Sequence, residues 1–342
     1  MQTQSQPTHY PTYFQPGNLF NIREVNRYFW SINRPMTLLF WAMLGTSILG
    51  LVGFALDERT VLGMPTWAKT SKFSLSIALY AATMLWVFGY DTLRPRLSRF
   101  ILSASAYILA LEIGLIIFQG SRAVPMHFNN ATPFDTTLFS IMGMSITLLW
   151  FINALGVAVL AAQRVPSRAL AWSLRLGLIV ALLGMLEGFL MTAPSPSQLA
   201  TLQAGQHADL IGAHTIGAAD GGPGLPFLGW STTHGDLRIG HFIGLHGLQV
   251  IPLLGLFLML RRDPWLTERR KLWLVVIGAT GYCSLAALAT WQALRGQPLT
   301  APDMLTVTVF VAIITATLVA AAIVILPARS QIAQPATATI SG

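Results

Sequence analysis

The chain has 342 residues, of which 54% are hydrophobic and only 10% are charged, and its mean hydropathy is +0.59. Soluble domains carry about 25% charged residues, so this composition excludes an ordinary soluble protein. The single cysteine, Cys283, excludes an intramolecular disulfide and any zinc, iron–sulfur or c-type haem motif that needs several cysteines.

Apolar blocks of about 20 residues recur along the chain, which is the length at which a helix crosses the hydrocarbon of a bilayer. Charged or Pro/Gly-rich segments separate these blocks. The pattern predicts an all-α fold, a polytopic transmembrane helix bundle of about eight spans. The expected spans lie near residues 36–56, 72–90, 100–119, 136–162, 169–191, 239–260, 272–294 and 303–326.

The net charge of +8 is spread unevenly between the two sides of these spans. The N-terminal segment and the segments on its side hold fourteen Lys or Arg residues, the other side holds six, and Arg175 lies inside the fifth span. Basic segments stay cytoplasmic. We therefore expect a multi-pass protein of the bacterial cytoplasmic (inner) membrane with both termini inside. The expected partners are the lipid bilayer and a small-molecule solute, and no nucleic acid.

Four regions follow from this topology. Residues 1–35 form a cytoplasmic tail, which includes either an interfacial helix or an unstructured lead-in to the first span. Residues 36–162 form a first four-helix half, and residues 163–329 form a second four-helix half. Residues 192–237 of that second half are a long outer loop, of a length typical of lids and binding loops. Residues 330–342 are expected to be a disordered cytoplasmic tail.

Three short matches relate the two halves in the same order. They pair residues 69–73 with 238–242, 119–122 with 292–295, and 132–135 with 300–303, at offsets of 169, 173 and 168 residues. Repeats of this kind predict a four-plus-four duplication. Because four is even, both halves would have the same orientation, related by an axis along the membrane normal. Such an arrangement leaves a site between the halves.

The sixth span carries polar groups that lipid penalises, so they must be shielded by protein or face water. At 100° per residue its glycines form a narrow stripe suited to close helix packing, made of Gly240, Gly244, Gly247 and Gly255. The polar side chains form an arc about 140° wide on the other side, made of Arg238, His241, His246 and Gln249. One side of the helix is expected to pack, and the other to line a cavity.

The second span carries a polar face made of Lys69, Lys72, Ser76, Tyr80, Thr83 and Tyr90. This face is either a polar track through the membrane or a set of structural groups. In the structural alternative, the two lysines extend to the outer surface and the hydroxyls bond to helix carbonyls.

Two carboxyl groups fall about 10 Å below the outer surface, counted at 1.5 Å per residue. Glu112 lies in the third span and Glu187 in the fifth. Such groups are candidate proton carriers or ligands. The structural alternative is an ion pair with Lys72, Arg122 or Arg238.

The loop before the fourth span holds Arg122, His127 and Asn129. Thr132, Pro133 and Asp135 follow in the pattern of a helix start, so Asp135 is expected to cap the helix rather than to catalyse. The long loop holds His214. The candidate metal ligands are His127, His214, His241 and His246, with Glu112 and Glu187 as further donors. His241 and His246 are five residues apart and hence about 140° apart, so they cannot form a simple two-histidine clamp.

Two strings carry a resemblance. PTWAKTSKF (residues 65–73) and GDLRIGHFIGLH (residues 235–246) resemble strings in a family of bacterial polytopic integral membrane proteins to which no activity is assigned. The eight-span duplicated layout also resembles that of haem A synthase, a family in which histidines from alternate spans bind haem. Here the sixth span has two histidines, whereas the second, fourth and eighth have none. The resemblance therefore implies the layout but not the haem activity.

The pattern favours an outward-facing polar cavity that binds or transports a small anionic solute. Its candidate ligand-binding residues are Lys69, Lys72, Tyr80, Glu112, Arg122, Asn129, Glu187, Arg238, His241, His246 and Gln249. The alternative is a membrane-embedded enzyme with haem or a divalent metal at the outer face. A third reading, a structural or assembly factor, predicts that neutralising the outer polar cluster leaves function intact.

Overall fold

The computed structural model of the protein describes residues 21–163, 165 and 167–332. Its helices are α1 (Ile22–Ile32), α2 (Arg34–Leu56), α3 (Thr66–Phe88), α4 (Pro95–Ser121), α5 (Pro133–Ala162), α6 (Arg168–Thr192), α7 (Pro196–Gln203), α8 (Arg238–Leu260), α9 (Glu268–Leu294) and α10 (Met304–Ile332). Its short strands are β1 (Thr60–Val61), β2 (Met64–Pro65), β3 (Thr215–Ile216) and β4 (Gly235–Asp236). The predicted all-α class is confirmed.

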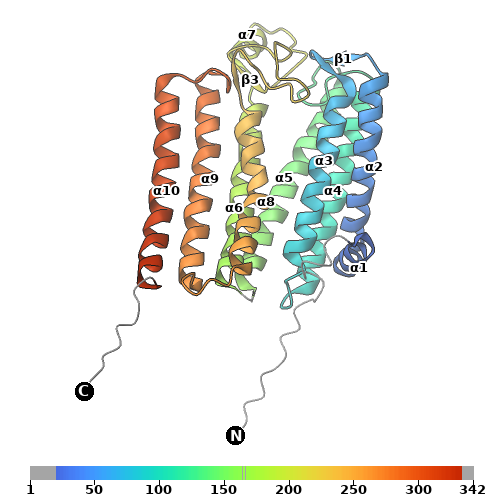
Figure 1. Ribbon diagram of the computed structural model, residues 1–342. Helices are drawn as coiled ribbons and strands as arrows, with labels where there is room; N and C mark the ends of the chain where they lie inside the picture. The colour runs from blue at the N-terminus through green and yellow to red at the C-terminus, as the bar shows by residue number, and fades with distance from the viewer. Residues whose placement is uncertain (1–20, 164, 166, 333–342) are drawn as a thin grey trace, which may run out of the picture.

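Eight of the described helices, α2 to α6 and α8 to α10, are long and apolar enough to cross a membrane. They stand side by side, and the strands and α7 gather at one end of the bundle, called the loop end below (Figure 1). The helix α1 lies at the opposite end (Figure 1). The predicted polytopic bundle of eight spans is therefore confirmed.

Two helix boundaries differ from those predicted. The second span begins at Thr66 rather than near residue 72, so Lys69 and Lys72 belong to its first two turns. Counting apolar residues misses such a start, because lysine stems are long enough to run along a helix while the ammonium reaches a polar region. The last span continues as helix to Ile332. Residues 1–20 and 333–342, which make up most of the two predicted tails, lie outside the described residues.

The helix α1 lies within the segment predicted to hold either an interfacial helix or an unstructured lead-in. Asn21 caps it by accepting a hydrogen bond from the backbone nitrogen of Arg23. Tyr28 and Phe29 are buried against the bundle, whereas Arg23 is exposed. The helix is thus amphipathic, with its apolar side covered by protein.

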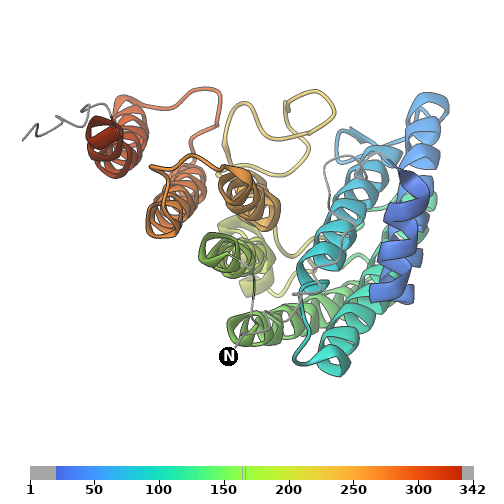
Figure 2. The same cartoon turned by 60° about the horizontal axis from the view of Figure 1, so that its bottom comes forward.

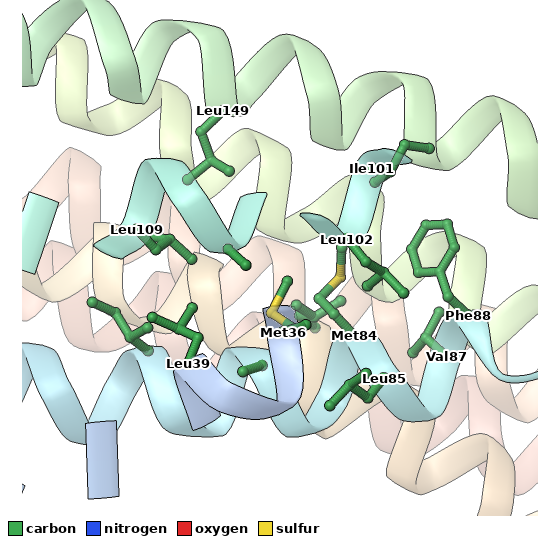
Figure 3. Close-up of a cluster of buried hydrophobic side chains, with 14 of the residues drawn as sticks. Met36, Leu39, Met84, Leu85, Val87, Phe88, Ile101, Leu102, Leu109 and Leu149 are labelled. Carbon is green, nitrogen blue, oxygen red and sulfur yellow. The ribbon is translucent and has the colours of Figure 1, made fainter. Parts of the chain in front are cut away.

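The main core lies among α2, α3, α4 and α5. Met36, Met84, Leu85, Ile101 and Leu102 are all buried there (Figure 3). Interiors of this kind are close-packed, and the same buried cluster continues into α6 through Leu174 and Leu178. Below, α2 to α5 are called the first half of the molecule, and the chain from α6 onward is called the second half.

The second half is organised around the contact between α6 and α8. A Cβ on Gly184 would lie 2.6 Å from the backbone carbonyl carbon of Gly244, so the two helix backbones touch. Gly247 and Gly255 also face α6, where they meet Val180 and Ser173. The predicted glycine packing stripe is confirmed for these positions, whereas Gly240 faces Thr290 of α9 and Glu187 of α6.

The two halves have the same order of elements. In each, a short antiparallel strand pair (β1–β2 or β3–β4) precedes the second span, α3 or α8. Each half also carries an arginine at the end of its third span that pairs with an aspartate at the start of the next. These pairs are Arg122 with Asp135 and Arg295 with Asp303, both at 2.6 Å. The predicted duplication gains these correspondences and stays a prediction.

The described helices of the two halves pack against each other chiefly at two places, and the long loop also joins the halves at the loop end, where the Asn130 nitrogen donates to the Asp209 oxygen at 2.7 Å. Helix α5 packs against α6, and the indole nitrogen of Trp150 donates to the carbonyl oxygen of Leu182 at 3.1 Å. Helices α3 and α8 contact each other at only a few points. The view turned by 60° shows α5 and α6 adjoining, while α2 and α10 lie at opposite ends of the molecule (Figure 2). The α3–α8 junction is therefore the loosely packed one.

Candidate functional site

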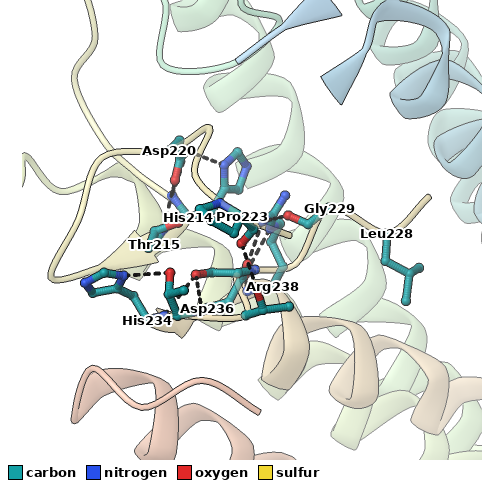
Figure 4. A network of polar contacts seen from close by, with 12 residues as sticks. His214, Thr215, Asp220, Pro223, Leu228, Gly229, His234, Asp236 and Arg238 are labelled. Atoms are coloured by element: carbon teal, nitrogen blue, oxygen red, sulfur yellow. Dashed lines mark hydrogen bonds and ion pairs between the residues drawn. The ribbon is translucent and has the colours of Figure 1, made fainter. Parts of the chain in front are cut away.

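The entry of α8 is fixed by a buried ion pair. Strand β4 ends at Asp236, whose side chain has no exposed surface. Its carboxylate accepts hydrogen bonds from the Arg238 backbone nitrogen (3.0 Å), Nε (2.9 Å) and Nη2 (2.5 Å), and from the backbone nitrogen of Ser231 (2.7 Å) (Figure 4). The Arg238 charge is thus paired and its guanidinium held in one orientation.

The entry of α3 carries two cations whose partners are neutral. Lys72 Nζ donates to the carbonyl oxygen of Leu228 at 2.8 Å, and Lys69 Nζ donates to Nδ1 of His127 at 2.6 Å. Both lysines are half-buried. Among the described residues, no carboxylate lies within 4.0 Å of either ammonium group. Two ammonium groups therefore stand partly desolvated without a counter-charge in contact.

A tight turn of the long loop, residues 224–231 (the capping turn), contacts Lys72 through the carbonyl oxygen of Leu228. It is closed by a β-bridge between Gly224 and Ser231 and by a hydrogen bond from the Leu225 nitrogen to the Trp230 oxygen (2.8 Å). Its tip adopts positive φ at Phe227 (60°), a conformation that non-glycine residues rarely take. Strain of this kind persists only where the surroundings impose it.

The capping turn belongs to the second half but is anchored to the first. The Phe227 ring packs edge-on against Phe54 of α2, with centroids 6.0 Å apart, and lies 5.9 Å from Lys72 Nζ. Arg238 Nη2 donates to the Gly229 carbonyl oxygen at 2.6 Å. The consecutive carbonyls of Leu228 and Gly229 therefore bind cations from α3 and α8 respectively, and the turn bridges the two halves.

Two half-buried histidines flank the lysines. His214 Nδ1 donates to Asp220 at 2.6 Å (Figure 4). The Phe128 ring packs edge-on against His214. Burial lowers the pKa of His127 well below its usual value, and the Lys69 ammonium and His214 lower it further. Burial also lowers the pKa of His214, although Asp220 raises it in part. Both imidazoles are therefore neutral at pH 7, and they add no charge to offset or reinforce the lysines.

Below the cations, polar faces of α3 and α8 run in parallel. From Lys72 to Thr83, and equally from Arg238 to Gln249, eleven residues rise about 16 Å. Gln249 Nε2 donates to Thr83 Oγ1 at 3.2 Å and joins the two helices at the lower end. Between these levels lie half-buried side chains from both helices, namely Phe73 and Ser76 from α3 and Phe242 and His246 from α8.

The other predicted residues of α8 divide between two faces. His246 hydrogen-bonds to Gln249 at 3.2 Å, on the face toward α3. His241 instead bonds through Nδ1 to the carbonyl oxygen of Gly184 at 2.6 Å, which turns it toward α6. The predicted polar arc is therefore not continuous on the α3 side.

Several predicted ligand-binding residues lie away from this junction. The Tyr80 hydroxyl donates to Asn153 of α5 at 2.9 Å. Glu112 is 4% exposed between α4 and α5, where the hydroxyl of Ser145 donates to it. Asn129 is buried in the loop before α5 and bonds to the carbonyl oxygen of Pro125. These contacts hold elements of the first half together.

Arg122 and Asp135 form a structural pair at the loop end. Arg122 pairs with Asp135 at 2.6 Å and lies over the rings of Phe118 and Phe134. Thr132 caps α5, as the sequence predicts, by accepting a hydrogen bond from the Asp135 nitrogen at 3.1 Å. The charge of Arg122 is therefore neutralised locally.

Glu187 occupies a separate position between α6, α8 and α9. A Cβ on Gly240 would lie 2.6 Å from its Oε2, beside Thr290. Oε2 is buried without a hydrogen-bond partner among the described residues. None of the predicted cations pairs with it or with Glu112 within 4.0 Å in the described part of the chain.

The donor set does not fit a divalent metal. In the described ranges, no group of three or more His, Cys, Asp or Glu side chains is placed to hold an ion. Structural and catalytic zinc sites use three or four such protein ligands.

Three contributors to the site escape sequence reasoning. Asp236 is hidden in a loop, and its spacing of two residues from Arg238 is the only signal of a local pair. The carbonyl oxygens of Leu228 and Gly229 have no side-chain signature at all, although the glycine-rich run before them indicates a tight turn.

Comparison of the chain with protein-family models, curated proteins and solved structures finds no match.

Proposed function

We propose that this membrane protein binds, and moves across the bilayer, a small anionic solute at the loop end of the α3–α8 junction. One observation carries the proposal. In the described part of the chain, Lys69 and Lys72 are half-buried cations that hydrogen-bond to neutral acceptors, and the capping turn contacts Lys72. Buried charges are ordinarily paired, because desolvation penalises an unpaired ion.

An anion would supply the missing counter-charge. Hydrogen bonds between ammonium groups and anionic oxygens are about twice as strong as those between neutral groups. Arg238, already held by Asp236, would present its remaining donor capacity in a fixed orientation. A cationic mouth also raises the local concentration of anions and speeds their association.

The polar faces below the mouth supply a path. The aligned residues of α3 and α8 lead from the cations to the Gln249–Thr83 hydrogen bond, about 16 Å further into the bundle. Glu187, which lies away from this path between α6, α8 and α9, is a carboxyl group able to carry a proton, and its Oε2 has no hydrogen-bond partner among the described residues. The excess of Lys and Arg on the side of the termini supports an orientation in which the loop end lies outside a bacterial inner membrane and both termini lie inside.

Binding of a panel of potassium salts to the purified protein in detergent tests the proposal. We expect at least one organic or inorganic oxyanion to raise the unfolding temperature in a saturable manner. Lys72→Gln should weaken that binding at least tenfold, and Lys72→Arg should retain part of it. Arg262→Gln removes an exposed cation at the opposite end and is the matched control. Unchanged binding in Lys69→Gln/Lys72→Gln would refute the assignment.

A haem enzyme is the second candidate, favoured by one feature. The Nδ1 atoms of His214 and His241 are each held by an acceptor, as in metal-bound histidines, so Nε2 of each ring is not engaged in these bonds. Haem needs only one or two axial ligands of this type. The visible absorption spectrum of the purified protein decides: a haem band lost in His214→Ala and His241→Ala supports this candidate, and a colourless folded protein removes it.

A further inference from the structure

The two carbonyl groups that bind the cations are adjacent along the chain. Lys72 Nζ binds the Leu228 oxygen at 2.8 Å, and Arg238 Nη2 binds the Gly229 oxygen at 2.6 Å. Consecutive Cα atoms are about 3.8 Å apart. The ammonium group from one half and the guanidinium group from the other therefore donate to two carbonyl oxygens that lie close together.

The segment that supplies these oxygens is held in a strained shape. Phe227 has φ 60°, and the Gly229 nitrogen donates a hydrogen bond to the Leu225 oxygen at 2.7 Å. Gly229 has φ 68°, and a Cβ there would lie 2.6 Å from the sulfur of Met64. A backbone carbonyl is also a weaker partner for a cation than an anionic oxygen. The capping turn therefore adopts a strained backbone conformation, although its carbonyl groups bind the cations less strongly than an anionic oxygen would.

We propose that the Leu228–Gly229 carbonyl pair is an internal substitute for the head group of the ligand. The ligand is accordingly a polyatomic oxyanion, such as a carboxylate, sulfonate or phosphate, which presents two oxygens to Lys72 and Arg238. A halide offers one spherical acceptor and cannot replace both carbonyls at once. Binding displaces the capping turn from α2 and α3, so occupancy of the site is coupled to opening of the loop. This inference rests on the proposed anion-binding function.

Aromatic rings beside the cations extend the assignment to the rest of the ligand. Phe73 lies 5.6 Å from Lys69 Nζ, and Trp230 packs against Phe242, whose ring neighbours His246. Phe73 follows Lys72 along α3, and Phe242 lies one turn after Arg238 in α8, so both rings lie near the two cations along their helices. The class that fits both features is an organic oxyanion with an apolar or aromatic body, rather than a bare inorganic ion.

A reversible cross-link of the capping turn tests the coupling. Cys283 is the only native cysteine, so Cys283→Ala supplies a cysteine-free background. In it, Phe54→Cys/Phe227→Cys can be joined by a short bis-methanethiosulfonate reagent, because the native rings are 6.0 Å apart. Phe118→Cys/Phe134→Cys, with native rings 6.2 Å apart at the Arg122 pair, is the matched control. Binding of benzoate, acetate, sulfate, phosphate and chloride is measured before cross-linking, after it, and after reduction.

We expect the Phe54–Phe227 cross-link to weaken oxyanion binding at least tenfold and reduction to restore it, whereas the Phe118–Phe134 cross-link leaves binding unchanged. Saturating benzoate should slow formation of the first cross-link but not of the second. Chloride should bind at least tenfold more weakly than the best oxyanion. Lys72-dependent binding that ignores the cross-link, or that favours chloride, overturns this inference and spares the proposed function. Absence of any Lys72-dependent binding refutes both.

Discussion

The entries of α3 and α8 occupy corresponding places in the two halves, yet they treat positive charge in opposite ways. At α8, the pair with the fully buried Asp236 fixes the orientation of Arg238, and the bond to the Gly229 carbonyl oxygen is additional to that pair. At α3, the partners of Lys69 and Lys72 in the described part of the chain are an imidazole nitrogen and a backbone carbonyl. The start of α8 therefore holds its cation in one orientation, whereas the cations at the start of α3 make bonds that a ligand can replace.

The difference follows from the chemistry of the side chains. Arginine has a planar, always-charged head with donors in a rigid fork, whereas lysine is a compact charge on a flexible stem. A fork held by one carboxylate gives a defined direction to its remaining donor. A flexible ammonium can follow whichever acceptor is present. The site thus combines one component that sets geometry with two components that adapt.

The largest expected effect comes from removing the ion pair between Arg238 and Asp236 at the start of α8. Asp236→Asn keeps the shape of the side chain but leaves the Arg238 charge without its partner. Breaking a buried pair in this way costs about 3–5 kcal/mol of unfolding free energy. Denaturant unfolding in detergent measures the loss. Asp303→Asn, in the half-exposed pair with Arg295, is the comparison and should cost clearly less. Equal losses would show that the α8 entry is no more rigid than the other pair.

The second effect concerns what holds α8 in position behind that entry. Gly184→Ala adds a Cβ only 2.6 Å from the Gly244 backbone, so α6 and α8 must separate. Overpacking of this kind typically costs about 1–3 kcal/mol. Gly143→Ala, in α5 with nothing within 4 Å of its Cβ, should be neutral or slightly stabilising. Thermal unfolding of the two variants measures the contrast, and similar transitions would mean that the glycine contact does not fix α8.

The sequence predicts the helices better than the site for identifiable physical reasons. Hydrophobic length and charge asymmetry are properties of long segments, so eight spans emerge clearly. The glycine stripe at Gly244, Gly247 and Gly255 is also legible, because a missing side chain has one consequence wherever the helix packs. The start of α3 is missed because two charged residues, Lys69 and Lys72, lie in its first turns, and a count of apolar residues assigns such residues to a loop.

The site depends on partners that come from distant segments. Gln249 meets Thr83 across 166 residues, and Lys72 meets Leu228 across 156. The helical wheel groups His241 with Gln249, but the carbonyl of Gly184 draws the imidazole to α6. A wheel gives the direction of the Cα–Cβ bond, whereas a long side chain takes the nearest partner its rotamers allow. Backbone acceptors such as Leu228 and Gly229 have no side-chain signature.

A third prediction tests the adaptable entry through pH. The pKa of His127 and of His214 is lowered in the folded protein, whereas both rings protonate near pH 6.5 in the unfolded chain. Below that pH the unfolded state binds more protons. The contribution of these two histidines to the unfolding free energy is therefore complete above pH 6.5. It decreases as the pH falls below 6.5, by at most about 1.4 kcal/mol per pH unit for each histidine.

His127→Asn separates this effect from packing, since the asparagine oxygen can still accept from Lys69 without titrating. Its unfolding free energy should fall less steeply between pH 7 and pH 5 than that of the unchanged protein. His207→Asn, at an exposed position of the long loop that also holds His214, should keep the original slope. Parallel slopes for all three proteins would show that neutrality of His127 does not support the α3 entry.

The smallest expected effect lies where the two polar faces join. Thr83→Val keeps the shape of the side chain but removes the acceptor for Gln249 Nε2, which bonds at 3.2 Å. Hydrogen bonds between transmembrane helices contribute about 0.6 kcal/mol on average, so stability should fall only slightly. If the bond closes the lower end of the path, however, solute flux in proteoliposomes should rise or lose its saturation, and Thr83→Ser should restore it. A change in stability without a change in flux would make Thr83 a packing residue and confine the ligand's route to the cationic entry.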